Sequence, residues 1–105
     1  MPQTHPDLYC FLGRAVAGDP APYRPGACHA LVAFTAAHGG LDEARAMLDQ
    51  ATRARGWNHL EIVQSTTFPS GARALDPGPA RDAAEDALLH GASVIVYPDE
   101  LTAEA

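Results

Sequence analysis

The sequence predicts an α+β domain, and the prediction rests on the order in which helical and strand patterns follow one another. Twice the chain runs through a helical pattern, a glycine and an apolar strand: first at residues 41–55, 56 and 60–63, and again at 79–90, 91 and 94–96. Residues 28–35 and 72–75 add one strand before each helix. Two such strand–helix–strand halves give a ferredoxin-like split βαβ two-layer sandwich, with both helices on one face of an antiparallel sheet.

The N-terminal part of the chain predicts two strands. Residues 8–16 are apolar and end before the break Gly18-Asp19-Pro20-Ala21-Pro22, so we expect an extra strand at the edge of the sheet. Residues 28–35 are largely apolar on both alternating faces, which is typical of a strand near the middle of a sheet.

Residues 41–55 carry the clearest helical pattern. Gly40 is a plausible N-cap, acidic residues 42 and 43 lie in the first turn, and Arg53 and Arg55 lie in the last, so both ends complement the helix dipole. Gly56 fits the left-handed position after a helix. The expected core-facing stripe is Leu41, Ala44, Leu48 and Ala51.

The second half of the chain repeats the pattern with smaller residues. A strand at 60–67 is followed by the short partner strand at 72–75, an alanine-rich helix at 79–90, and a last strand at 93–97 that Pro98 stops. The whole chain, residues 1–105, is expected to be one domain with frayed ends at 1–7 and 99–105. An open, doubly wound mixed sheet is the alternative, and it fits less well because two helices must then cover two faces.

Charge and hydropathy exclude several classes of protein. The formal net charge is −6, and residues 76–105 account for it, with seven carboxylates against Arg81. Such a surface repels phosphate backbones, so we expect no nucleic-acid partner. No apolar run approaches the roughly 20 residues of a membrane-spanning helix, and the N-terminus lacks a signal-peptide pattern. A cytoplasmic location is therefore expected.

A resemblance extends over roughly residues 30–98. The run Ala54-Arg55-Gly56-Trp57, the alanine-rich helix and the strand Val94-Ile95-Val96-Tyr97-Pro98 resemble small bacterial ferredoxin-like α+β domain proteins. The resemblance implies this fold and a bacterial cytosolic setting. It implies no activity, cofactor or site residue.

The spacing of metal-ligand and nucleophile types predicts neither a metal site nor a catalytic centre. Five histidines and two cysteines are present, but no Cys-x-x-Cys, His-x-x-x-His or His-Glu-x-x-His occurs. Cys10 and Cys28 lie in apolar runs, where cysteine behaves as a small hydrophobe. We expect no cofactor, no metal and no catalytic residue, and the sequence leaves open whether the two thiols pair.

The function that follows is a non-enzymatic binding or interaction module that forms a homodimer through its sheet face, with Leu31, Ala33 and the loop residue Tyr23 as contact residues. The alternative is a small enzyme or ligand sensor with a cavity between two such sheets, lined by His29 and Tyr9. A third hypothesis is an inhibitor whose acidic residues 76–105 dock on a basic protein partner.

Overall fold

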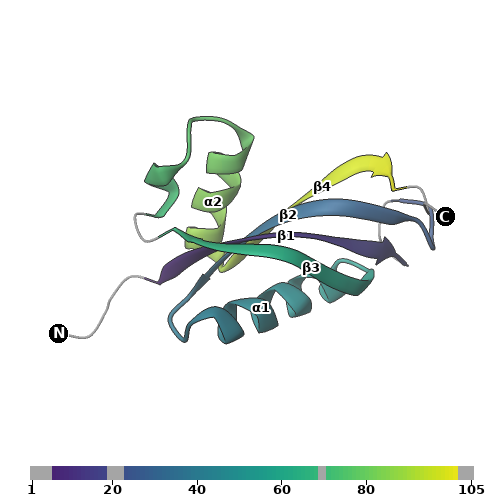
Figure 1. The fold of residues 1–105 in the computed structure, drawn as a ribbon, viewed down its shortest axis with the longest axis horizontal. Helices are drawn as coiled ribbons and strands as arrows, with labels where there is room; N and C mark the ends of the chain where they lie inside the picture. The colour runs from purple at the N-terminus through teal and green to yellow at the C-terminus, as the bar shows by residue number, and fades with distance from the viewer. Residues whose placement is uncertain (1–5, 19–22, 69–70, 102–105) are drawn as a thin grey trace.

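The computed structural model describes residues 6–18, 23–68 and 71–101, which form an antiparallel sheet with two α-helices and one short 3-10 helix (Figure 1). The elements follow in the order β1 (Asp7–Ala17), β2 (Cys28–Ala37), α1 (Leu41–Ala54), β3 (Trp57–Phe68), η1 (Gly71–Ala74), α2 (Pro79–His90) and β4 (Ala92–Glu100). The predicted α+β class is therefore confirmed. No helix in the described ranges combines the length and the apolar character needed to cross a bilayer.

The four strands are ordered β3-β1-β2-β4, and every neighbouring pair is antiparallel. The prediction that β2 lies inside the sheet is confirmed. The prediction that residues 8–16 form an edge strand is wrong, because β1 pairs with β2 on one side and with β3 on the other. The hairpin of β1 and β2 is thus the centre of the sheet, and the later strands add to its two sides.

The predicted strand at residues 72–75 is also wrong, because η1 occupies this segment. Gly71 has a positive φ of 69°, and Ala72 is buried against the α2 side of the sheet. Without this strand β3 is shared by both strand–helix–strand units, so there are not two separate halves. The strand order also differs from that of a ferredoxin-like sandwich. At the other end of the chain, residues 99 and 100 belong to β4 and are not frayed, since an edge strand tolerates Pro98.

Both α-helices begin and end close to the predicted residues. Gly40 is the N-cap of α1 with a φ of 91°, and Gly56 after the helix has a φ of 89°, conformations that glycine adopts without a Cβ penalty. In α2, a proline occupies the first turn and Gly91 is the C-cap. Local sequence signals therefore place the helices correctly, even though they do not fix the strand order.

The two helices pack against opposite faces of the sheet, so the expected single helical layer is not found. Alternate residues of a strand point to opposite faces. Phe11 of β1 shares a cluster with Leu48 of α1, whereas Leu8 of β1 shares a cluster with Ala84 of α2. Figure 1 shows α1 on one side of the strands and α2 on the other. We call the two sides the α1 face and the α2 face.

The pairing of β1 with β3 is irregular at two places, and both are imposed by particular residues. One register shift lies beside Gly13, where an added Cβ would stand 2.5 Å from the Glu61 carbonyl oxygen. The other lies at His59, whose φ of 53° is in the left-handed region that a bulge residue adopts. Each shift places one additional β3 residue opposite β1.

Candidate functional site

His29 is the most enclosed polar side chain at the end of the sheet where β1 and β2 are joined. Its ring packs 4.4 Å from the ring of Tyr23 and 5.6 Å, edge to face, from that of Trp57. The Nδ1 atom lies 2.9 Å from the carbonyl oxygen of Tyr97, so an Nδ1–H proton donates to this backbone acceptor. Nε2 is buried and has no partner among the described residues. We call Tyr23, His29 and Trp57 the His29 cluster.

An ion pair between Arg24 and Glu100 lies beside the His29 cluster, because Glu100 is the residue of β4 opposite His29. Arg24 donates from Nε and Nη2 to the two carboxylate oxygens of Glu100, at 3.0 and 2.7 Å. The hydrogen bond from Arg24 holds the pKa of Glu100 below its ordinary value. Leu101 N–H also donates to the Cys28 carbonyl oxygen at 2.7 Å. These contacts join the end of β4 to the loop before β2 and to the first residue of β2, beside the His29 cluster.

Tyr9 lies on the same face as His29 but at the far end of the sheet. Tyr9 pairs with Thr35 and Ala15 pairs with His29, so six residues of strand separate the two positions, about 20 Å. Burial, assisted by the Asp7 carboxylate, raises the pKa of the Tyr9 phenol. Because α1 packs between the two ends, Tyr9 and His29 do not line a common site as the sequence suggested.

Leu31 and Ala33, the expected contact residues of a dimer, are core residues. Both are buried on the α1 face, in the cluster that includes Leu48 of α1. They cannot meet a second protein while α1 is in place, so the contact surface assigned to them is corrected. Tyr23 is half-buried and packs on the rings of His29 and Trp57 within its own domain.

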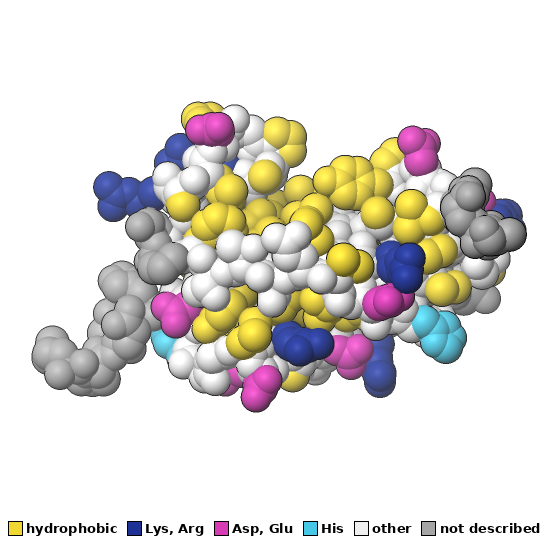
Figure 2. Space-filling view, viewed as in Figure 1, with side chains coloured by type: hydrophobic (Ala, Val, Ile, Leu, Met, Phe, Trp, Pro, Cys, Tyr) yellow, Lys and Arg dark blue, Asp and Glu magenta, His cyan; other side chains and the backbone are white. Residues whose placement is uncertain are grey.

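The sheet surface that remains uncovered is one half of the α2 face. Its members are the outward side chains beyond the reach of α2, and they include two exposed large hydrophobic residues: Leu12 is 40% and Tyr97 49% exposed. Figure 2 shows hydrophobic side chains gathered over the strands beside α2. We call this surface the open face. It consists of Leu12, Arg14, Val16, Ala30 and Tyr97, placed by strand alternation from their buried neighbours.

An ion pair crosses the open face between two strands. Arg14 of β1 donates from Nε to a carboxylate oxygen of Glu61 of β3 at 2.8 Å, and both side chains are half-exposed. The hydrogen bond with Arg14 lowers the pKa of Glu61, and that with Glu61 raises the pKa of Arg14. The charges cancel, so the open face is an apolar surface with one neutral ion pair.

The two cysteines lie on the α2 face but far apart. Cys10 pairs with Phe34, near α2, and Cys28 pairs with Val16, beside the open face, so about 20 Å of strand separates them. Cysteines bridge only when their Cα atoms lie within about 7 Å, so the two thiols are free. Burial raises the pKa of the Cys10 thiol, which makes it a poor nucleophile.

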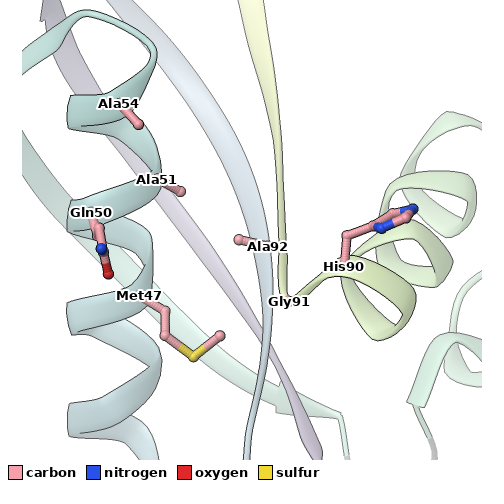
Figure 3. A pocket seen from close by; sticks show the side chains of 7 residues that line it. All are labelled: Met47, Gln50, Ala51, Ala54, His90, Gly91 and Ala92. Atoms are coloured by element: carbon pink, nitrogen blue, oxygen red, sulfur yellow. The ribbon is translucent and has the colours of Figure 1, made fainter.

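A shallow groove lies between α1 and the turn from α2 into β4 (Figure 3). It is lined by Met47, Gln50, Ala51, Ala54, His90, Gly91 and Ala92. The His90 ring points away from α1 and lies 3.5 Å from the Asp86 carboxylate on its own helix. Binding sites for small molecules need several converging polar groups, and this groove offers Gln50 alone.

The described residues contain no group of three or more His, Cys, Asp or Glu side chains that could hold a metal ion. No family model, curated protein or solved structure matches the chain. The resemblance to bacterial ferredoxin-like proteins therefore stays a prediction. The open face was missed at the sequence level because an edge position was expected for residues 8–16, although Leu12 and Val16 already share an apolar alternation in that run.

Proposed function

We propose that this chain is a non-enzymatic interaction module that binds a second copy of itself through the open face. The observation that carries the proposal is the unequal cover of the two sheet faces. Side chains of the central strands β1 and β2 are buried on the α1 face, whereas the α2 face leaves Leu12 and Tyr97 exposed. A contiguous apolar sheet surface of this kind is a preferred contact site for another protein.

Charge supports a second copy as the occupant. Among the described residues, the one ion pair on the open face joins a cation and an anion, Arg14 and Glu61, so a two-fold axis can place each beside its opposite in the partner copy. The acidic residues of α2, such as Asp82 and Glu85, lie on the helix side turned away from the buried alanines, and therefore away from the sheet. The chain is acidic as a whole, yet its open face is not.

The size of the open face sets the expected strength of the contact. Four strands spaced by about 4.8 Å, with some five residues each, cover roughly 20 by 15 Å. This is smaller than the ~800 Å² per partner that a standard interface buries. We therefore expect a dissociation constant in the micromolar range, with dimers that form and separate as the protein concentration changes.

The first experiment measures mass in solution by sedimentation velocity and native mass spectrometry over a range of concentrations. We expect the chain to approach twice its monomer mass as concentration rises. Leu12→Glu should remain monomeric, because it buries a charge in the contact. Leu89→Glu is the matched control, since Leu89 is 79% exposed on α2 and outside the open face, and it should dimerise normally.

A monomeric wild-type chain at every concentration would reject the proposal, as would a Leu12→Glu variant that dimerises as well as the control. The native cysteines give a second measurement. Alkylation of Cys28, beside the open face, should slow as concentration rises, while alkylation of Cys10, near α2, should not change. Equal concentration dependence of the two thiols would contradict a contact at the open face.

A ligand sensor is the second candidate, and one observation favours it. Nε2 of His29 is a buried acceptor without a partner among the described residues, and such an atom can bind a donor group of a small molecule. The same native mass spectrum tests this candidate. Extra mass on the purified chain that His29→Phe removes would support it, and a bare polypeptide mass would reject it.

A further inference from the structure

Within the described residues the sheet has two free edges, β3 and β4, and they differ in how well they are protected. An edge strand presents unpaired backbone N–H and C=O groups that can pair with another strand, and proteins block such edges with proline, charge or irregular geometry. In β4, Pro98 removes a donor and Asp99 and Glu100 add two charges. The register of β4 against β2 also shifts between His29 and Leu31. The second half of the β4 edge is therefore blocked, and residues 92–96 in its first half are only partly exposed.

The second half of the β3 edge carries neither proline nor charge, and its one irregularity is the register shift at Val63, so residues 64–68 pair regularly with β1. Residues 62–68, Ile-Val-Gln-Ser-Thr-Thr-Phe, contain no charged residue and no proline. Five consecutive residues, 63–67, are exposed, and three of them are β-branched, a composition that favours strands. Among residues 6–18, 23–68 and 71–101, β3 pairs with β1 alone, which satisfies one side of the strand. The other side is an open template for strand addition.

We propose that the free edge of β3 pairs antiparallel with the β3 edge of a second copy, so that two sheets join into one continuous sheet. This contact is separate from the open face, because it extends the sheet sideways and does not cover either face. A chain that uses both contacts assembles beyond the dimer through two kinds of two-fold interface, and the assembly closes as a tetramer if the two axes intersect at right angles. Either contact can exist without the other.

A second copy fits this edge because the uncharged stretch is complementary to itself. Antiparallel pairing centred on Ser65 places residues 62–68 of one copy against the same residues of the other. The nearest carboxylate, Glu61, is four residues from the centre, so the two Glu61 residues lie about 26 Å apart. Like charges that meet directly across strands would oppose pairing, and none meet here.

The side of α1 nearest to β3 also accepts a second copy. Met47 points toward the start of β4, where its Cε would lie 3.5 Å from a Cβ at Gly91. Helix geometry therefore turns Arg45 and Asp49 toward the β3 side. These two residues carry opposite charges, and Arg45 has no ion pair within the described part of the chain. The side of α1 nearest to β3 therefore presents Arg45 and Asp49, whose charges cancel, to an approaching copy.

The test is residue-resolved amide hydrogen exchange of β3, measured by NMR at low and high protein concentration. In a monomer, β3 amides that do not donate to β1 exchange rapidly and alternate with protected ones. If two β3 edges pair, these outward amides should become at least tenfold slower to exchange at high concentration. Contacts at the open face leave the outward amides unpaired, so they do not produce this signal.

Two variants separate the edge from the open face. Thr66→Lys places a charge in the centre of the edge at an exposed position and should abolish the concentration-dependent protection. Ala46→Lys, an exposed position on α1, is the control of equal charge and should retain it. Protected β1 and β2 amides in both variants confirm that the sheet is folded.

Leu12→Glu should keep the protection of the outward β3 amides even where it abolishes the open-face dimer. The inference is overturned if these amides exchange rapidly at all concentrations, or if Thr66→Lys leaves their protection unchanged. Loss of the protection in Leu12→Glu with retention in Thr66→Lys also overturns it, since association then depends on the open face. In that outcome the proposed function stands and the edge contact does not.

Discussion

The two faces of the sheet are built from the same strands yet differ in how completely they are covered. Phe11 and Leu12 are neighbours in β1, and the first is 0% and the second 40% exposed. Phe11 packs in the α1 cluster, and Leu12 lies where α2 no longer reaches. On the central strands β1 and β2, the α1 face is buried, whereas α2 covers only one end of the α2 face.

The direction and composition of the helices explain this difference. In Figure 1, α1 runs along the strands, whereas α2 rises steeply from one end of them. The α2 cluster accordingly reaches Leu8 and Phe34 but not Arg14 or Ala30. Alanines form the buried side of α2, so it packs closely but covers little area. A helix that contacts only one end of a sheet leaves a surface for another protein.

The largest expected effect comes from substituting the two neighbours separately. Phe11→Ala should reduce the free energy of unfolding by about 3–5 kcal/mol, because it opens a cavity in a closed core. Leu12→Ala should cost less than about 1 kcal/mol, since solvent already reaches that side chain. Urea unfolding at low protein concentration measures both. Similar losses for the two variants would show that the α2 face is as closed as the α1 face.

A smaller effect is expected in the local stability of the helices. Because α2 is held by alanines at one end of the sheet, it should open more readily than α1, which buries Leu48. Native-state hydrogen exchange should give α2 amides at least about tenfold less protection than α1 amides, about 1.4 kcal/mol in opening free energy. Equal protection would mean that both helices open only with the whole fold.

The smallest effect concerns the ion pair of the open face. The folded-state pKa of Glu61 is lowered by Arg14, so the unfolded chain takes up the proton at a higher pH than the folded chain. The pair therefore stabilises the fold above the ordinary glutamate pKa of 4.5, and this contribution is lost as pH falls below it, through the folded-state value. Both groups are exposed, so the contribution is small.

Glu61→Gln should flatten the acid side of the curve of stability against pH, measured by urea unfolding across that range. Asp82→Asn, which removes an exposed carboxylate of α2 that has no ion pair within the described part of the chain, is the comparison. If the two variants flatten the curve equally, the effect of Glu61→Gln comes from the lost negative charge alone, and the pairing of Glu61 with Arg14 contributes no stability of its own.

The local structure of the chain was largely predictable from the sequence. Both helices lie where the periodicity and the glycine positions place them, and Gly56 and Gly91 take the positive φ expected after a helix. The error at residues 72–75 is instructive. Four apolar-rich residues are too few to separate a strand from a helical turn, and contacts of Ala72 with the α2 cluster decide the outcome.

The candidate site was less predictable, because strand order decides which residues are exposed. Leu31 and Ala33 are typical of a sheet surface in the sequence, but α1 covers them. Tyr9 and His29 share a face, as expected, yet the antiparallel register places them at opposite ends. The alternation of side chains along a single strand does not reveal its pairing register. When both alternating sets are apolar, it also does not reveal which set a helix covers.

The sequence by itself determined the α+β class, the extents of the helices and the position of β2 inside the sheet. The helices depend on contacts between residues near in the chain, which local patterns report directly, and the apolar character of both alternating faces of residues 28–35 indicates an interior strand without specifying its partners. Only the tertiary structure decided that β1 is central, that the helices take opposite faces and that the open face and the β3 edge stay uncovered. Those outcomes depend on pairing between distant strands, where the burial of each residue is set by its partners and not by its neighbours in sequence.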